Sequence, residues 1–293
     1  MKKSLPTRVL GKTKVQLPIL GFGTAPSGNR LDIKAAVLLY ESALNQGITY
    51  FDTAPEFAGY GNAQVQLGQL LKDRRKEVFL VTKCFEPKGE AALKLLERSL
   101  RELQTDFADL VFVHNLGADK MDPQMVFSRH GTYPALIKAK QLGLTRFVGL
   151  SGHNRPHRFA EAIPEYEVDV LLNASNFVDR HTYNFEERVW SLAVQRRIGV
   201  IAMKVYGGKS QSWFAGLSNS FMPKPYLDLA FRYALSQPQV ACAVIGMATP
   251  QELTENLARA RRFTPLHQKE WNKLEPIGMR LAKEWGAHFG AVT

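Results

Sequence analysis

Short apolar runs recur along the chain, and most of them are separated by longer segments whose apolar positions follow a helical spacing. This alternation is typical of βα units that build a parallel sheet buried on both faces. Eight such runs are present, at residues 18–24, 48–54, 78–83, 108–115, 146–152, 168–176, 198–204 and 240–246. Open doubly wound sheets usually have fewer strands, so eight units favour an α/β fold of the (β/α)8 TIM-barrel type.

The segments around these runs complete the predicted architecture. Residues 7–16 predict an N-terminal hairpin that turns at the sequence Gly-Lys-Thr-Lys. The tail, residues 266–290, predicts one or two further helices over the barrel. Since no linker-like change of composition interrupts the chain, we expect a single barrel domain spanning residues 1–293. Apolar residues at i, i+3 and i+4 predict helices within residues 31–47, 91–104, 225–238 and 249–262.

The composition agrees with a soluble globular protein. Of the 293 residues, 45% are hydrophobic and 22% are charged, and no long uncharged apolar stretch suited to a bilayer is present. Charges interrupt the basic start of the chain before an apolar segment forms, so no export signal is expected. Cys84 and Cys242, the only cysteines, lie far apart in strand-like runs, which predicts free thiols and a cytoplasmic protein.

The formal net charge of +11 raises the question of an anionic partner, either a nucleic acid or a small ligand. The chain has no dense block of Lys and Arg interleaved with aromatic residues, as nucleic-acid-binding segments usually have. We therefore expect a basic solvated surface, with neither nucleic acid nor membrane as a partner. The sequence gives no indication of the oligomeric state.

Polar residues stand at the ends of five consecutive runs, and in a barrel the chemistry lies at the carboxyl ends of the strands. Taken singly, such residues have ordinary structural explanations, since a carboxylate can cap a turn and a histidine can be a hydrogen-bonded core residue. Their occurrence on consecutive strands instead predicts a site at one rim of the barrel. The residues are Asp52, Lys83, His114, Ser151, and the pair Asn173 and Asn176.

Three of these side chains, together with Tyr60 in the loop after Asp52, have a common chemical logic. A phenol has an ordinary pKa near 10, and a neighbouring ammonium group lowers that pKa by stabilising the phenolate; we expect Lys83 to act on Tyr60 in this way. Asp52 would keep the buried Lys83 charged. His114 would donate a hydrogen bond to the oxygen of a bound carbonyl and stabilise the negative charge that develops there.

Seven stretches carry these residues and their surroundings: RVLGKTKVQLPILGFGT, YFDTAPEFAGYGNAQVQLGQLL, LVTK, DLVFVHN, FVGLSGHN, ASNFVDR and VIGMATPQELTENLARA. They resemble the aldo-keto reductase superfamily over nearly the whole chain. The resemblance implies a (β/α)8 barrel that reduces a small-molecule carbonyl by hydride transfer from a nicotinamide cofactor, without a metal. It also implies a catalytic tetrad of Asp52, Tyr60, Lys83 and His114, with Tyr60 as the proton donor.

The resemblance further implies where the cofactor would bind. Ser151 and Asn173 would reach the nicotinamide amide. The loop from Tyr206 to Ser210 would hold the pyrophosphate, because its glycines let backbone N–H groups approach. Glu252 and Asn256 would lie by the adenine. The implied cofactor-binding residues are Gly23, Thr24, Ser151, Asn173, Met203, Lys204, Tyr206, Gly207, Gly208, Gly246, Glu252 and Asn256.

The choice of cofactor and of substrate depends on residues outside the tetrad. NADPH is the expected cofactor. NADH is also possible, because Ala248 replaces the basic residue that often binds the 2′-phosphate. Stand-ins for that residue are Lys209, Arg259, Arg261 and Arg262. The substrate is not identified by the sequence, and candidates for an apolar substrate pocket are the loop aromatics Phe85, Trp213, Phe214 and Phe221.

The position of the tyrosine leaves one alternative open. In most relatives the reactive tyrosine follows the aspartate by about five residues, and Phe57 holds that position here. A chain without a reactive tyrosine would be a non-catalytic regulatory subunit of the same fold that binds the nicotinamide cofactor. The spacing from Tyr60 to the Leu-Gly that follows it matches the family, and this favours Tyr60 as the equivalent tyrosine.

A second alternative is a metal-dependent hydrolase on the same barrel. His153 and His157 lie four residues apart, which suits one face of a helix, and Asp52 and His114 would complete the ligand set. Pro156 falls between the two histidines and no second cluster of ligands accompanies them. The ordinary interpretation of both histidines is a polar loop.

Overall fold

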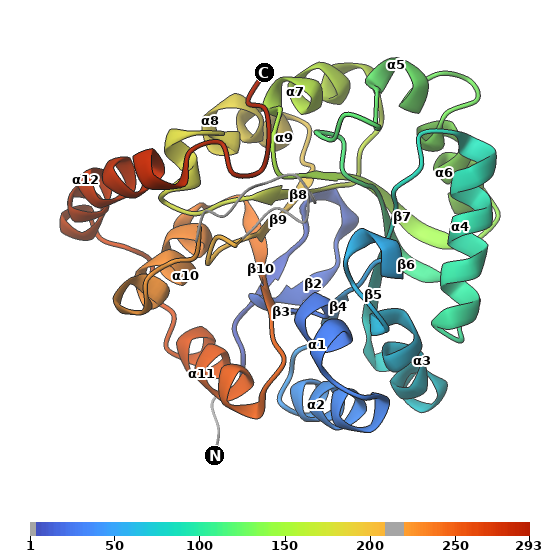
Figure 1. Ribbon diagram of the computed structural model, residues 1–293, viewed down its shortest axis with the longest axis horizontal. Helices are drawn as coiled ribbons and strands as arrows, with labels where there is room; N and C mark the ends of the chain where they lie inside the picture. Colours follow the sequence, from blue (N-terminus) through green and yellow to red (C-terminus); the bar gives the residue numbers. More distant parts are fainter. Residues whose placement is uncertain (1–3, 209–219) are drawn as a thin grey trace.

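The computed structural model describes residues 4–208 and 220–293. Eight parallel strands close into a barrel in the order β10-β3-β4-β5-β6-β7-β8-β9, and helices surround it (Figure 1). Each predicted run overlaps one strand, so the predicted (β/α)8 barrel is confirmed. The strands are β3 (Leu20–Gly23), β4 (Tyr50–Asp52), β5 (Phe79–Cys84), β6 (Ala108–Val113), β7 (Thr145–Gly152), β8 (Val170–Ala174), β9 (Gly199–Met203) and β10 (Val240–Gly246).

The four helices predicted from apolar spacing are present as α2, α4, α10 and α11. Their ends have identifiable causes: the Asp32 carboxylate accepts from Ala35 N and caps α2, and Thr249 and Glu252 form a capping box at α11. The helices are α1 (Ala25–Arg30), α2 (Ile33–Asn45), α3 (Ala63–Arg74), α4 (Gly89–Glu102), α5 (Pro123–Val126), α6 (Thr132–Gln141), α7 (Pro156–Glu165), α8 (Phe185–Arg188), α9 (Trp190–Gln195), α10 (Leu227–Ser236), α11 (Pro250–Arg261) and α12 (Gln268–Trp285). None of the helices in the described ranges is both long and apolar enough to cross a bilayer.

The predicted hairpin is confirmed as the antiparallel pair β1 (Thr7–Val9) and β2 (Gln16–Pro18). Leu10 and Leu17 from this hairpin belong to the buried cluster that fills the barrel interior. The hairpin therefore packs on the amino-terminal ends of the strands, and the site can form at the opposite, carboxyl-terminal end.

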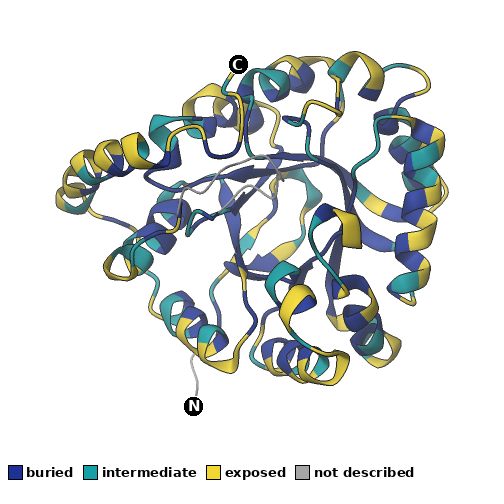
Figure 2. Cartoon of the chain, in the orientation of Figure 1, coloured by how far each residue is buried: buried dark blue, intermediate teal, exposed yellow. Residues whose placement is uncertain are grey.

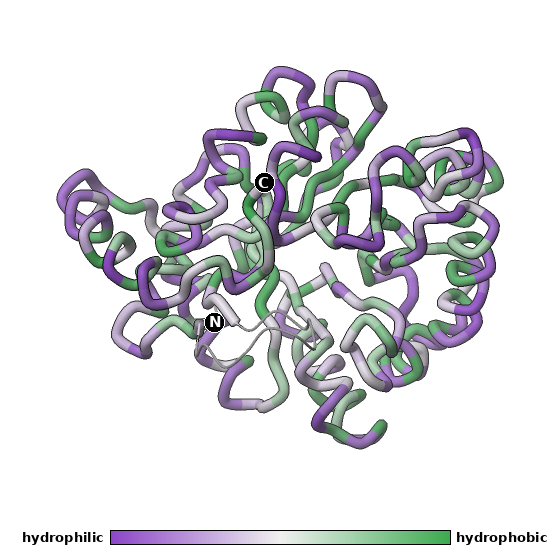
Figure 3. Tube along the Cα trace, turned by 45° about the horizontal axis from the view of Figure 1, so that its top comes forward, coloured by the Kyte–Doolittle hydropathy of each residue, from purple (hydrophilic) through white to green (hydrophobic). Residues whose placement is uncertain are grey.

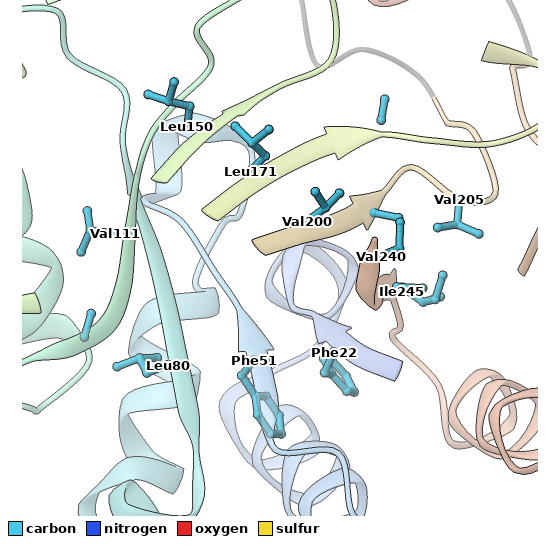
Figure 4. Close-up of a cluster of buried hydrophobic side chains, with 14 of the residues drawn as sticks. Phe22, Phe51, Leu80, Val111, Leu150, Leu171, Val200, Val205, Val240 and Ile245 are labelled. Atoms are coloured by element: carbon cyan, nitrogen blue, oxygen red, sulfur yellow. The ribbon is translucent and has the colours of Figure 1, made fainter. Parts of the chain in front are cut away.

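Two layers of buried side chains follow from the alternation of side chains along each strand. Figure 4 shows the outer layer, in which Phe22, Phe51, Leu80 and Val111 lie on the helix-facing side of the barrel. Figure 2 shows barrel strands that are mostly buried and helices whose outer faces are exposed. In Figure 3 the hydrophilic positions gather on those outer helical turns. The inner layer includes Tyr50, Phe79, Val81, Leu110, Phe112, Val170, Leu172 and Met203.

The same alternation places the polar strand ends. Asp52 follows Tyr50 by two positions and Lys83 follows Val81 by two, so both point to the inside of the barrel at its carboxyl-terminal end. Register in the sheet brings them together, since β4 and β5 are paired neighbours. The barrel thus delivers two opposite charges to one point of the rim.

The tail after α12 returns to this rim. One or two helices are predicted within the tail, and the structure has the single helix α12. Residues 286–293 then continue beyond it (Figure 1). Asn154, just after β7, donates to the Ala291 carbonyl at 3.1 Å. Phe289 N donates to Tyr183 Oη at 2.8 Å. These contacts fix the end of the chain beside the carboxyl ends of β7 and β8.

Candidate active site

The side chains of Asp52, Lys83 and Tyr60 meet at the carboxyl ends of β4 and β5. Lys83 Nζ donates to Asp52 Oδ1 at 2.5 Å and to Tyr60 Oη at 3.0 Å. It also donates to the Thr53 carbonyl at 2.9 Å. Tyr60 Oη in turn donates to Asp52 Oδ1 at 3.0 Å. The ammonium, the carboxylate and the phenol therefore form a closed triangle.

The loop after β4 decides which aromatic residue reaches this triangle. Glu56–Ala58 form one 3-10 turn (η2), which ends at Gly59 with φ of 83°, a left-handed conformation that suits glycine. This turn carries Phe57 to the surface, where it is 49% exposed. The chain then doubles back, and Tyr60 lies over the strand end. The tyrosine, and not the phenylalanine at the usual spacing, is the aromatic residue bonded to Lys83 and Asp52.

Burial, with the Asp52 carboxylate adding to it, decides the protonation of Tyr60 in this arrangement. Burial, followed by the charge of Asp52 and the hydrogen bond to it, raises the pKa of Tyr60 well above its ordinary value of 10.0. The net shift is opposite to the lowering expected from Lys83, because burial and the contact between phenol and carboxylate raise the pKa. Tyr60 therefore keeps its proton throughout the neutral range.

Lys83 and Asp52 form a buried ion pair, with side chains that are 1% and 4% exposed. Burial lowers the pKa of Lys83 from its ordinary 10.5, and the charge and hydrogen bond of Asp52 oppose that shift. Each charge depends on the other, since a buried ion without its partner is strongly unfavourable. This agrees with the expected role of Asp52 as the group that keeps Lys83 charged.

His114 lies one residue beyond β6 and is 8% exposed. Its Nδ1 lies 2.8 Å from Ser151 Oγ, and this contact orients the ring. Burial lowers the pKa of His114 well below 6.5, and the charges of Lys83 and Lys204 lower it further. The imidazole is therefore neutral at physiological pH and acts through hydrogen bonds. Ser151, expected at the nicotinamide amide, is bonded to this histidine.

Asn173 does not reach the rim as the sequence suggested. It lies on the same side of β8 as Leu171, the helix-facing side, and is fully buried. Its Oδ1 accepts from Trp190 Nε1 at 3.3 Å, and its Nδ2 donates to the Gly152 carbonyl at 3.5 Å. This placement gives no support to its predicted contact with the nicotinamide amide.

Gly23, Thr24 and Gly246 lie where β3 and β10 end side by side. Gly23 and Gly246 are partners in register, and a Cβ added at Gly23 would lie 3.2 Å from Gly246 N. Thr24 donates twice to the Asp52 carbonyl, from its backbone N and from its hydroxyl, each at 2.9 Å. These residues thus hold the end of β4 and keep the adjoining rim narrow.

The predicted pyrophosphate loop is described only in part, because Lys209 and Ser210 lie outside the described residues. Gly207 has φ of +67°, and a Cβ there would lie 2.2 Å from the Ser220 carbonyl. Gly207 N donates to the Lys204 carbonyl at 2.7 Å, and Gly208 N donates to the Ser220 carbonyl at 2.6 Å. Both N–H groups are already bonded, so the expected approach of these two groups to a pyrophosphate is not supported.

Met203 is the last residue of β9, and Lys204 follows it at the start of this loop. Met203 belongs to the cluster inside the barrel and is 9% exposed, so its thioether reaches the rim from within. Burial lowers the pKa of Lys204 to about 8, with Asp179 opposing the shift and Lys83 adding to it. A flat aromatic ring and an anionic group would both find a partner at this part of the rim.

Tyr206, Glu252 and Asn256 form the far end of the predicted cofactor strip. Tyr206 Oη donates to Asn256 Oδ1 at 2.8 Å, and Arg259 donates to the same oxygen at 3.2 Å. Glu252 Oε2 accepts from the backbone N–H groups of Ala248 and Thr249, so this carboxylate serves the capping box of α11. Asn256 Nδ2 also donates to the Glu252 carbonyl at 2.9 Å, so the guanidinium of Arg259 keeps most of the hydrogen-bonding capacity towards a ligand.

The aromatic candidates for a substrate pocket are distributed unequally. The Phe85 ring lies 5.5 Å from the His114 ring in an edge-on contact, which places it at the site. Phe221 is 57% exposed. Trp213 and Phe214 lie outside the described residues.

The alternative metal site gains no support from the structure. Within residues 4–208 and 220–293, no three His, Cys, Asp or Glu side chains are grouped so that they could hold a metal ion. Cys84 and Cys242 are both buried free thiols, as predicted.

Two residues at the site were missed by the sequence analysis. The His153 ring lies 6.1 Å from the His114 ring, and Phe289 of the tail lies 5.3 Å from His153. His153 had been considered only as a metal ligand, although it follows Ser151 by two positions and so shares its side of the chain. No sequence signal indicated that the last residues return to the rim.

The fold and the site together define a class of protein. It is a (β/α)8 barrel in which a buried Asp–Lys pair binds a protonated tyrosine, and a neutral histidine follows the neighbouring strand. Residues 19–215 match the model of the aldo/keto reductase family, and the chain belongs to that family. The family comprises oxidoreductases that generally bind nicotinamide cofactors.

The chain is similar in sequence to a further oxidoreductase and in fold to two solved structures. L-galactose dehydrogenase of Arabidopsis thaliana is 28% identical over 92% of this chain and 93% of its own length. The holo form of an aldo-keto reductase from Bacillus halodurans has a TM-score of 0.75 at 23% identity, covering 98% of this chain and 100% of its own. An aldo-keto reductase from Klebsiella pneumoniae in complex with NADPH has a TM-score of 0.72 at 21% identity, with coverages of 94% and 95%.

Proposed function

We propose that the chain is an NAD(P)H-dependent aldo-keto reductase that reduces an aldehyde or ketone to an alcohol, with Tyr60 as the proton donor. The observation that carries this proposal is the triangle of Tyr60, Lys83 and Asp52, which holds a protonated phenol at the mouth of the barrel. A carbonyl oxygen that gains negative charge needs such a donor within hydrogen-bond reach.

The roles of the four residues follow from their contacts. As negative charge develops on the substrate oxygen, Tyr60 Oη gives up its proton, and Lys83 Nζ at 3.0 Å stabilises the resulting phenolate. Asp52 keeps Lys83 charged and in place. When Ser151 donates to His114 Nδ1, His114 Nε2 carries the ring hydrogen and donates it to the same substrate oxygen.

The residues of the rim fit a nicotinamide cofactor in their chemistry, which supplies a hydride when it is bound. Met203 offers an apolar contact for a flat ring, and Lys204 offers a cation to the phosphates. Asn256 and Arg259 offer an amide and a guanidinium group towards the adenosine end. The Klebsiella aldo-keto reductase of similar fold is in complex with NADPH, and this supports the same cofactor here.

The non-catalytic alternative depended on Phe57 taking the place of the reactive tyrosine. Since Phe57 is exposed and Tyr60 carries the contacts with Lys83 and Asp52, turnover is the better-supported function. Because one relative is an L-galactose dehydrogenase, both carbonyl reduction and alcohol oxidation should be assayed. The same groups can accept a proton from an alcohol.

The proposal is tested with a panel of aldehydes and ketones assayed separately with NADPH and NADH, and of alcohols with NADP⁺ and NAD⁺. Turnover of any substrate with any of these cofactors, at a rate that increases with protein concentration, would support the proposal. A chain that binds a nicotinamide cofactor, as followed by fluorescence, but turns over none of the panel would instead be the regulatory subunit.

We expect NADPH to bind at least about tenfold more tightly than NADH, because a charge-assisted hydrogen bond contributes about 1.5–3 kcal/mol. Arg259 is the described residue best placed to bind the 2′-phosphate, with a side chain that is 17% exposed and bonded to Asn256. Arg259→Gln should weaken NADPH and leave NADH nearly unchanged in a fluorescence titration. Arg98→Gln, which removes a 51% exposed arginine on α4, is the matched control. Equal affinities for both cofactors in the unmodified chain would contradict the prediction.

A further inference from the structure

His114 has two different aromatic neighbours at the mouth of the barrel. On one flank, the Phe85 ring lies 5.5 Å away at an interplanar angle of 66°. On the other flank, the His153 ring lies 6.1 Å away at 81°. A carbonyl group held by His114 therefore has an apolar wall on one side and a second imidazole on the other.

The His153 ring is available for binding. Neither of its ring nitrogens has a hydrogen-bond partner among the described residues, and the residue is only partly buried. Only the backbone N of His153 is bonded, weakly, to Asn115 Oδ1 at 3.4 Å. Phe289 supports the ring from the tail at 5.3 Å. The imidazole is thus held in place by packing, with both of its polar atoms unused.

The groups around His153 keep it neutral. Burial lowers its pKa well below 6.5, and the positive charges of Lys204 and Lys83 add to the shift, as does the neighbouring imidazole of His114. A neutral imidazole has one donor and one acceptor nitrogen, which is the complement of a hydroxyl group. It offers no net charge to a carboxylate or phosphate.

We propose that His153 binds a hydroxyl group on the carbon next to the substrate carbonyl, so that the chain prefers α-hydroxy aldehydes and ketones to their deoxy counterparts. This inference rests on the proposed function, since the carbonyl is placed by Tyr60 and His114. Hydrogen bonds join heavy atoms about 2.7–3.2 Å apart, so the oxygen one carbon beyond a carbonyl bound to His114 lies within reach of His153. A site that hydrogen-bonds a hydroxyl discriminates strongly against a substrate that lacks it.

The test compares two nearly isosteric pairs, hydroxyacetaldehyde with propanal and hydroxyacetone with butanone, by kcat/KM. The unmodified chain should prefer the hydroxylated member of each pair by about tenfold or more, the value of one well-formed hydrogen bond. His153→Phe keeps an aromatic ring between Phe289 and His114 but removes both nitrogens. It should lower kcat/KM about tenfold for the hydroxylated substrates and change it less than about twofold for the others.

Two further variants separate this role from a structural one. His153→Gln retains a donor and an acceptor, and it should recover part of the preference for the hydroxyl. His130→Phe makes the same change at an exposed histidine before α6 and should leave both substrates unaffected. An unchanged preference in His153→Phe would overturn the inference. So would equal losses for all substrates with weaker cofactor binding, because His153 would then contact the cofactor.

A binding measurement keeps the inference testable without turnover. The histidine Cε1 signals are followed by NMR, and the His153 signal is identified by its loss in His153→Phe. With cofactor present, 1,2-ethanediol should shift that signal and 1-propanol should not. No shift with either alcohol would overturn the inference. A chain that shows the shift but turns over no substrate would retain the hydroxyl site and lose the proposed function.

Discussion

Tyr60→Phe is expected to lower carbonyl reduction by about 10²–10⁴-fold, the usual contribution of a positioned general acid, while cofactor binding stays intact. The substitution removes one oxygen and preserves the ring. That oxygen is the one bonded to both Lys83 and Asp52, so its loss removes the proton that the substrate oxygen needs. The measurement is kcat with the best substrate of the panel, alongside a fluorescence titration with the cofactor.

Two control variants make the Tyr60 result specific. Phe57→Leu alters the exposed aromatic residue at the usual family spacing and should leave kcat nearly unchanged. Tyr166→Phe removes a phenol oxygen from a ring that stacks on Phe127 at 4.2 Å, and it should also be silent. A Tyr60→Phe variant that retains most of the wild-type rate would show that the proton comes from another group.

The pH dependence distinguishes the two candidate donors. Because the pKa of Tyr60 is raised, its phenol stays protonated above neutral pH, and kcat for reduction should stay level up to the ordinary tyrosine range near 10. Because the pKa of His114 is lowered, this histidine is already neutral at pH 7 and cannot lose a proton there. A fall in kcat as pH rises through about 6.5 would instead indicate a histidine donor.

The barrel could be predicted from the sequence because strands buried on both faces are continuous apolar runs. The polar residues at their ends were equally visible, and three of them, with Tyr60, lie together as the barrel topology requires. Side-chain directions and partners could not be predicted in the same way. Alternation along β8 places Asn173 with Leu171 on the helix-facing side of the barrel. The motif spacing gives the position of Asn173 in the sequence but not the side of the strand on which it lies. Ser151 is bonded to His114, and no one-dimensional pattern indicates such a partner.

The electrostatic error at Tyr60 has the same origin. The sequence placed an ammonium and a carboxylate near the phenol, but it could not give their distances. Burial raises the pKa of Tyr60 most, and Asp52 Oδ1, which accepts from the phenol at 3.0 Å, raises it further. Lys83 therefore acts chiefly after the proton has left, when it stabilises the phenolate, and much less on the resting tyrosine.

The substitution Lys83→Met tests this role of the lysine. It should reduce kcat by about 10²-fold or more, because the interaction of the ammonium with the Tyr60 phenolate in the transition state is lost. Cofactor affinity should change little. The variant also leaves Asp52 buried without its counter-charge, which costs about 3–5 kcal/mol of folding stability when one partner of a buried pair is removed. A lower Tm is therefore expected together with the kinetic loss, and the two effects must be separated.

The double variant Asp52→Asn, Lys83→Met separates them. It removes both charges, so the uncompensated buried carboxylate is gone and the Tm should recover towards that of the wild-type chain. Turnover should not recover, because Tyr60 still lacks the ammonium that stabilises its phenolate. If kcat rose together with Tm, the defect of Lys83→Met would lie in folding alone. Normal turnover in Lys83→Met itself would show that the chemistry does not pass through the Tyr60 phenolate, and the roles of all four residues would have to be reassigned.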